Sequence, residues 1–180
     1  MMDIINIILH LDKYIGVVLE NYHSYFYILF FLVIFCETGL VVTPFLPGDS
    51  LLFVAGAFAG AGQLHIGVLI VILILAAFLG DNTNFIFGKF VGDKLFSNPN
   101  SKIFRRDILA KTHEFYERHG SKAIIIARFI PLVRTFAPFV AGLGHMTYRK
   151  FVSFSLIASL LWVIIFLCGG FLFGNIPVIK

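Results

Sequence analysis

Five ionisable side chains lie inside or at the edges of strongly apolar stretches: Glu37, Asp49, Asp81, Arg128 and Arg134. A charge at the centre of a bilayer costs about 2.5–3.5 kcal/mol, so it persists where it faces another charge, water or a substrate. Arginine suits bidentate recognition of a phosphate, and a carboxyl group removed from water readily holds a proton. These residues predict a polar site inside a membrane protein.

The two arginines are the candidate phosphate ligands. Arg128 and Arg134 are six residues apart, which on a straight helix would point them about 120° away from each other. Pro131 lies midway, and a break there would let the two guanidinium groups converge. We therefore expect both arginines to clamp the phosphate of one anionic ligand.

The carboxylates are the candidate proton carriers. Glu37, Asp49 and Asp81 carry three negative charges against the two positive charges of the arginines, so one proton makes the set neutral. Protonation would then favour the entry of an anion. Asp81 is expected near the cytoplasmic end of its span. Close packing between helices explains the residues around it as well as a role in the polar site does. The competing explanation for Glu37, Asp49, Arg128 and Arg134 is a set of buried ion pairs that brace the fold.

The composition is that of an integral membrane protein. Hydrophobic residues make up 59% of the 180 residues and charged residues 13%, and the mean hydropathy is +0.93. We expect residues 1–180 to form one transmembrane domain, and residues 1–6 do not resemble a signal peptide. The two cysteines and the spacing of the acidic residues predict no metal site, no cofactor and no catalytic residue, and no motif predicts nucleic-acid binding.

The apolar stretches predict an all-α fold. Residues 151–173, 65–87 and 22–40 are long enough to cross a membrane, whereas 51–61 and 123–127 are too short. The short stretches lie beside residues that interrupt helices, and we expect the chain to break at Pro44, Pro47, Gly48, Pro131 and Pro138. Broken segments at membrane depth predict two re-entrant helical hairpins.

The two interrupted regions resemble each other. Phe-Leu-Pro at 45–47 precedes Phe-Val-Ala-Gly at 53–56, and Phe-Ile-Pro at 129–131 precedes the same four residues at 139–142. Interrupted segments at corresponding places in two halves indicate the binding site of a transporter. Chance is the alternative, because these residue types are common in this chain.

The basic residues predict the topology. Residues 89–122 contain eight lysines and arginines and residues 61–65 contain none, so 89–122 is expected in the cytoplasm and 61–65 outside. The first hairpin then enters from outside and the second from inside, which is an inverted-topology repeat. We expect a cytoplasmic amphipathic helix over 101–119 and an amphipathic N-terminal helix over 3–20.

The chain resembles the DedA family of bacterial inner-membrane proteins, also called the SNARE-associated or VTT-domain family. The resemblance rests on Phe35-Cys36-Glu37-Thr38-Gly39-Leu40, Pro47-Gly48-Asp49-Ser50, Phe96-Ser97-Asn98-Pro99-Asn100, Arg105-Arg106, Ala127-Arg128-Phe129-Ile130-Pro131 and Gly142-Leu143-Gly144-His145. It implies two re-entrant hairpins, dependence on the proton motive force and transport of undecaprenyl phosphate. In the family pattern the acidic pair falls on Glu37 and Asp49 and the essential arginines on Arg128 and Arg134.

The resemblance also bears on the C-terminus. Similar members continue past Gly174-Asn175-Ile176-Pro177 into another hydrophobic helix, whereas this chain stops at Lys180. We therefore expect a further C-terminal helix to be missing from this sequence.

The leading hypothesis is a proton-coupled flippase that returns a polyprenyl-phosphate lipid across the bacterial inner membrane. Its expected partners are that lipid, protons and the surrounding membrane lipids. A homo-oligomer is a further option. An energy-independent phospholipid scramblase and a scaffold that transports nothing are the alternatives. An intramembrane lipid phosphatase is disfavoured, because the sequence offers no set of metal ligands or nucleophile with its base.

Overall fold

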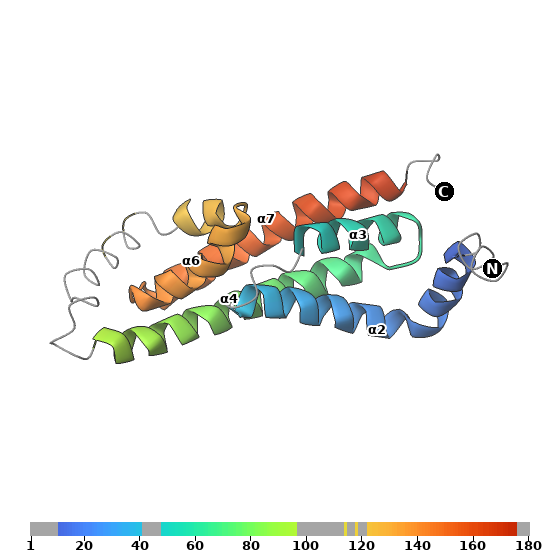
Figure 1. Ribbon diagram of the computed structural model, residues 1–180. Helices are drawn as coiled ribbons and strands as arrows, with labels where there is room; N and C mark the ends of the chain where they lie inside the picture. The colour runs from blue at the N-terminus through green and yellow to red at the C-terminus, as the bar shows by residue number, and fades with distance from the viewer. Residues whose placement is uncertain (1–10, 41–47, 97–113, 115–117, 119–121, 176–180) are drawn as a thin grey trace.

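The fold is known from a computed structural model that describes residues 11–40, 48–96, 114, 118 and 122–175 (Figure 1). Within these ranges the chain is helical and contains no strand, which confirms the predicted all-α class. The helices are α2 (Leu11–Gly39), α3 (Gly48–Gly60), α4 (Ile66–Phe96), α6 (Pro131–Leu143) and α7 (Tyr148–Gly174).

Two of these helices have the length and composition of membrane spans. An apolar stretch of 26 residues in α4 and all 27 residues of α7 exceed the roughly 20 residues that cross a bilayer. Both helices expose large apolar side chains on their outer faces, such as Leu75 and Leu79 on α4 and Leu160 and Ile165 on α7. An apolar outer surface of this kind fits a lipid environment, because lipid tails solvate it well.

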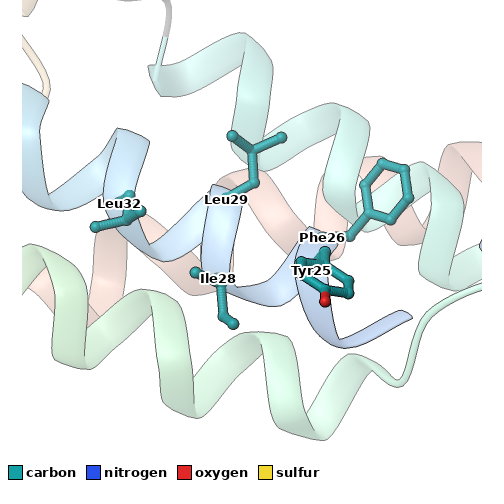
Figure 2. Close-up of a pocket in the computed structure, with 5 residues that line it drawn as sticks. All are labelled: Tyr25, Phe26, Ile28, Leu29 and Leu32. Carbon is teal, nitrogen blue, oxygen red and sulfur yellow. The ribbon is translucent and has the colours of Figure 1, made fainter. Parts of the chain in front are cut away.

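The N-terminal helix runs through two predicted segments. We expected a span over 22–40 and an amphipathic helix over 3–20; α2 is continuous from Leu11 to Gly39, and residues 3–10 lie outside the described residues. Its segment Tyr25–Gly39 is apolar. A shallow apolar groove of about 340 Å³ runs along this part and is lined by Tyr25, Phe26, Ile28, Leu29 and Leu32 (Figure 2). The groove lies away from the charged residues of the sequence prediction.

Helix α3 packs against α7 through glycines on both helices. A Cβ atom at Gly56 of α3 would lie 2.1 Å from the Leu167 carbonyl oxygen, and one at Gly170 of α7 would lie 1.9 Å from the Phe53 carbonyl oxygen. Small residues let membrane helices approach until their backbones touch. The short helix of the first half therefore binds the long helix of the second half.

Helix α6 packs against α4 in the same way. A Cβ atom at Gly142 of α6 would lie 2.0 Å from the Phe85 carbonyl oxygen, and one at Gly88 of α4 would lie 2.1 Å from the Phe139 carbonyl oxygen. Phe53 and Gly56 are the repeat equivalents of Phe139 and Gly142, and they make equivalent contacts with the same spacing. In each half of the chain, the repeated residues lie on a short helix that packs against the long helix of the other half. This equivalence argues against a chance similarity of the two sequences.

The chain reverses direction twice beside the middle of α4. In Figure 1, α2 and α3 approach this region from one end of the molecule, and the segment 122–143 approaches it from the other. The Asn84 amide group connects the two reversals, because Nδ2 donates to the Thr38 carbonyl oxygen at 3.1 Å and to the Thr135 carbonyl oxygen at 2.7 Å. The tips of both halves therefore meet at one residue of α4.

The second reversal forms at a break before α6. Residues 122–127 are helical, residues 128–130 form a turn, and α6 begins at Pro131. Ile130 is extended (φ −110°, ψ 109°), as the ring of a following proline favours. Pro138, which we expected to be a second break, lies inside α6, and the helix continues through it. Gly48 begins α3, whereas Pro44 and Pro47 lie outside the described residues.

Most of the predicted cytoplasmic helix over 101–119 also lies outside the described residues. Glu114 and Arg118 are described, and they form the expected i,i+4 ion pair at 2.9 Å. Both side chains are largely exposed, so the pair contributes little to stability.

Candidate functional site

The first half of the chain contributes two carboxylates, one from the end of α2 and one from the start of α3. Glu37, in the last turn of α2, is fully buried, and Asp49 lies in the first turn of α3 with its side chain 33% exposed. The Gly48 backbone N–H donates to Glu37 Oε1 at 3.2 Å. A Cβ atom at Gly48 would lie 1.8 Å from Glu37 Oε2, so this position needs a residue without a side chain.

Arg134 brings a positive charge to both of these carboxylates. It lies in the first turn of α6, just after the break at 128–130, and is buried. Its Nη2 atom pairs with Glu37 Oε1, and its Nη1 atom pairs with Asp49 Oδ1. The two halves of the chain are therefore joined by one guanidinium group between two carboxylates.

Arg128 pairs with the third carboxylate. It lies at the break itself and is buried, and its Nη1 atom contacts Asp81 Oδ2 on α4. Ser155 on α7 donates its hydroxyl group to the same Asp81 oxygen at 2.7 Å. Three separate segments thus meet at Asp81.

The position of Asp81 corrects the sequence interpretation. We expected it near the cytoplasmic end of a span that ended at about residue 87, where a carboxylate is easily accommodated. Because α4 continues to Phe96, Asp81 lies at the middle of the helix and is 1% exposed. It belongs to the same buried group as the other four charged residues.

Trp162 on α7 contacts both ion-pair groups and was not predicted as part of the site. Its Nε1–H donates to Asp49 Oδ1 at 2.7 Å. The guanidinium carbons of Arg128 and Arg134 each lie 5.0 Å from the centroid of the indole ring. Trp162 is fully buried, and it touches three charged side chains.

A sequence signal for this contribution exists on α7. Ser155, Ser159 and Trp162 follow the i, i+4, i+7 spacing of one helix face, and all three are fully buried. Hydroxyl groups and an indole N–H on one face of an otherwise apolar span need polar partners inside the protein. This face predicts that α7 borders a polar interior.

Several buried polar atoms of this group have no hydrogen-bond partner among the described residues. They are Arg128 Nε, Arg128 Nη2, Arg134 Nε, Glu37 Oε2 and Ser159 Oγ. An unpaired buried donor or acceptor costs about 1–3 kcal/mol, more when it is charged. The site therefore has unused capacity for a polar ligand or water, and Arg128, with a single carboxylate partner, has most of it.

The site is made of charged side chains joined in ion pairs. In the described part of the chain no three histidine, cysteine or acidic residues form a group that could hold a metal ion. Arg134 is shared by two carboxylates, while Arg128 has one. Arg128 is therefore the guanidinium group with less carboxylate charge around it.

Comparison with known proteins identifies the family. A model of the VTT domain matches residues 46–172, which include four of the five charged residues of the site. The chain is 55% identical to Protein DedA of Escherichia coli strain K12 over 179 residues, covering 98% of this chain and 82% of that protein.

More distant relatives are also membrane proteins. An uncharacterized membrane protein of Mycobacterium leprae is 39% identical over 148 residues, covering 82% of this chain and 66% of that protein. Inner membrane protein YqjA of Escherichia coli strain K12 is 34% identical over 152 residues, covering 84% of this chain and 69% of that protein. No solved structure matches. These names support a place in the bacterial inner membrane. The chain belongs to the DedA family of membrane proteins, which share the VTT domain.

Proposed function

We propose that this protein is a proton-coupled membrane transporter that moves a polyprenyl-phosphate lipid, such as undecaprenyl phosphate, across the bacterial inner membrane. The observation that carries the proposal is the convergence of two buried arginines and three carboxylates beside Trp162 at the middle of an apolar helix bundle. Buried charges of this kind inside a membrane protein mark a substrate or proton pathway.

In the proposed mechanism the phosphate group binds first to Arg128. This arginine holds two buried N–H donors, at Nε and Nη2, that have no partner among the described residues. A phosphate can accept both, because the guanidinium group presents its donors in a planar fork. Arg134 joins the clamp when Glu37 or Asp49 releases it.

Proton uptake provides that release. With Glu37, Asp49 and Asp81 ionised, the three carboxylates outnumber the two arginines by one charge and repel a phosphate. A proton on Glu37 or Asp49 weakens its ion pair with Arg134 and makes the site neutral. Anion entry and proton entry are thereby coupled, and the proton gradient gives the transport its direction.

The proposed topology follows the two reversals at the middle of α4. We place α4 and α7 across the bilayer and treat α2–α3 and the segment 122–143 as re-entrant hairpins that enter from opposite leaflets. The segment 89–122, which begins in the last turns of α4, then lies in the cytoplasm, as its basic residues predict. An inverted repeat with its site at mid-membrane is a recurrent architecture of secondary transporters.

A direct test is equilibrium binding of the purified protein to undecaprenyl phosphate, with undecaprenol as the matched ligand that lacks the phosphate. We expect selective binding of the phosphate form and its loss in Arg128→Gln. Equal binding of both lipids would contradict the proposal, because the site would then not recognise phosphate.

A non-transporting scaffold is the second candidate, because each arginine already has a carboxylate partner. An energy-independent scramblase would use the same pathway without protons. Collapse of the proton gradient in reconstituted vesicles separates the candidates, since it stops only the coupled transporter.

A further inference from the structure

Trp162 contacts charged residues of both ion-pair groups, Arg128 with Asp81 and Arg134 with Glu37 and Asp49. Its ring lies 5.0 Å from the guanidinium carbons of both Arg128 and Arg134, and its Nε1–H donates to Asp49 Oδ1 at 2.7 Å. Arg134 pairs with that same Asp49 oxygen. The indole N–H and the Arg134 guanidinium group therefore bind the same oxygen of Asp49.

The shared ring offsets the repulsion between the two arginines. Two guanidinium carbons at this distance from one centroid can be no further apart than twice that distance, so their like charges repel. The face of an indole ring carries negative charge and attracts cations, most strongly where water is excluded. The ring thus favours the arrangement in which both guanidinium groups remain in one site.

The orientation of the ring is fixed from two sides. Phe166 contacts it edge-on with ring centroids 6.3 Å apart, and the hydrogen bond to Asp49 holds the Nε1 edge. The hydrogen bond is strongest while Asp49 is ionised, because a charged acceptor strengthens it.

We propose that Trp162 is a positioning residue that couples the two arginines to the proton state of Asp49. When Asp49 takes up a proton, its bonds to the indole and to Arg134 weaken together. Arg134 keeps its pair with Glu37 and Arg128 keeps its pair with Asp81, but the released indole leaves both guanidinium groups freer to turn toward an anion. This inference rests on the proposed function for the identity of the anion, but the contacts themselves can be tested without any ligand.

The ligand-free test uses the fluorescence of the purified full chain, because Trp162 is the sole tryptophan. We expect Asp49→Asn and Arg128→Lys each to shift the emission maximum or its intensity, and the wild-type emission to change with pH in a way that Asp49→Asn abolishes. Ser153→Ala is the matched control, since Ser153 lies on α7 but is exposed and bonds only its own helix at 3.0 Å. Emission that is the same in all four proteins overturns the proposal.

The ligand test compares Trp162→Phe, which keeps an aromatic face but loses the donor, with Trp162→Leu, which loses both. We expect undecaprenyl phosphate to bind about tenfold more weakly to Trp162→Leu, equivalent to about 1.4 kcal/mol, with Trp162→Phe in between. The pH dependence of binding should flatten in Trp162→Phe, which a purely structural role would not cause. Phe173→Leu is the control for lost aromatic packing on the same helix, because the Phe173 ring packs against Phe53, with centroids 5.6 Å apart.

The outcomes separate this inference from the proposed function. If Trp162→Leu binds undecaprenyl phosphate as the wild type does, the positioning role is wrong and the transporter proposal stands. If the wild type does not distinguish undecaprenyl phosphate from undecaprenol, the transporter proposal fails, and the fluorescence result alone decides the positioning role.

Discussion

Gly48 lies directly against Glu37: its N–H donates to Oε1 at 3.2 Å, and a Cβ atom in its place would lie 1.8 Å from Oε2. The carboxylate is fully buried, so it has no room to retreat into solvent. The start of α3 and the proposed proton carrier at the end of α2 thus form one unit. The identity of residue 48 controls the placement of the carboxylate.

Replacement of Gly48 by alanine should therefore disrupt the site. The added methyl group must displace Glu37 from the Gly48 N–H and from Arg134, and overpacking of this kind costs about 1–3 kcal/mol. We expect a lower thermal unfolding midpoint in detergent and loss of transport. Gly169→Ala is the control, because its Cβ would meet only the Phe53 ring at 3.8 Å; equal behaviour of the two variants would contradict this prediction.

Arg128→Lys distinguishes phosphate recognition from bracing of the fold. A lysine keeps the charge that pairs with Asp81 but loses the planar fork whose Nε and Nη2 donors have no partner among the described residues. We expect binding of undecaprenyl phosphate to weaken about tenfold or more while the unfolding midpoint changes little. A variant that binds as the wild type does would favour the scaffold.

The Asn84 amide group should be essential for holding the two reversals together. Asn84→Ala removes the hydrogen bonds to the Thr38 and Thr135 carbonyl oxygens, which are buried and would lose this donor. We expect a loss of about 1–3 kcal/mol, measured as a lower unfolding midpoint. Thr83→Ala, one residue away on the exposed face, should be nearly neutral because its hydroxyl group bonds only its own helix.

The exchanged packing of the two halves predicts paired mutational effects. Gly56→Ala should separate α3 from α7, and Gly142→Ala should separate α6 from α4, because each new methyl group meets a backbone carbonyl at about the same distance. We expect similar decreases in the unfolding midpoint for the two variants. Destabilisation by one variant and tolerance of the other would show that the two interfaces are not equivalent.

The charged residues could be identified from the sequence because a charge inside a membrane has a high free-energy cost. Glu37, Asp49, Asp81, Arg128 and Arg134 stand out against an apolar background whatever the three-dimensional fold, and the structure brings all five together. Which carboxylate pairs with which arginine could not be predicted, because it depends on where α4 ends. The extension of α4 to Phe96 moves Asp81 from the expected helix end to the middle.

Other features depended on packing that local patterns do not encode. In the sequence, Trp162 is a large apolar side chain in the middle of a span, as a core residue would be. Its contacts with Asp49 and both arginines, which place it in the site, are visible only in the structure. Pro138 predicted a break, yet α6 continues through it. The close contacts of α6 with α4, at Gly142 and Gly88, help to stabilise this helix despite the proline inside it.

Proton-driven transport in reconstituted vesicles tests the central claim most directly. An imposed proton gradient should drive undecaprenyl phosphate across the membrane with the wild-type protein. Glu37→Gln, which keeps the shape of the side chain but cannot carry the proton, should leave a folded protein whose residual transport no longer responds to the gradient. A Glu37→Gln variant whose transport follows the gradient as the wild type does would contradict the coupling of proton and anion at this site.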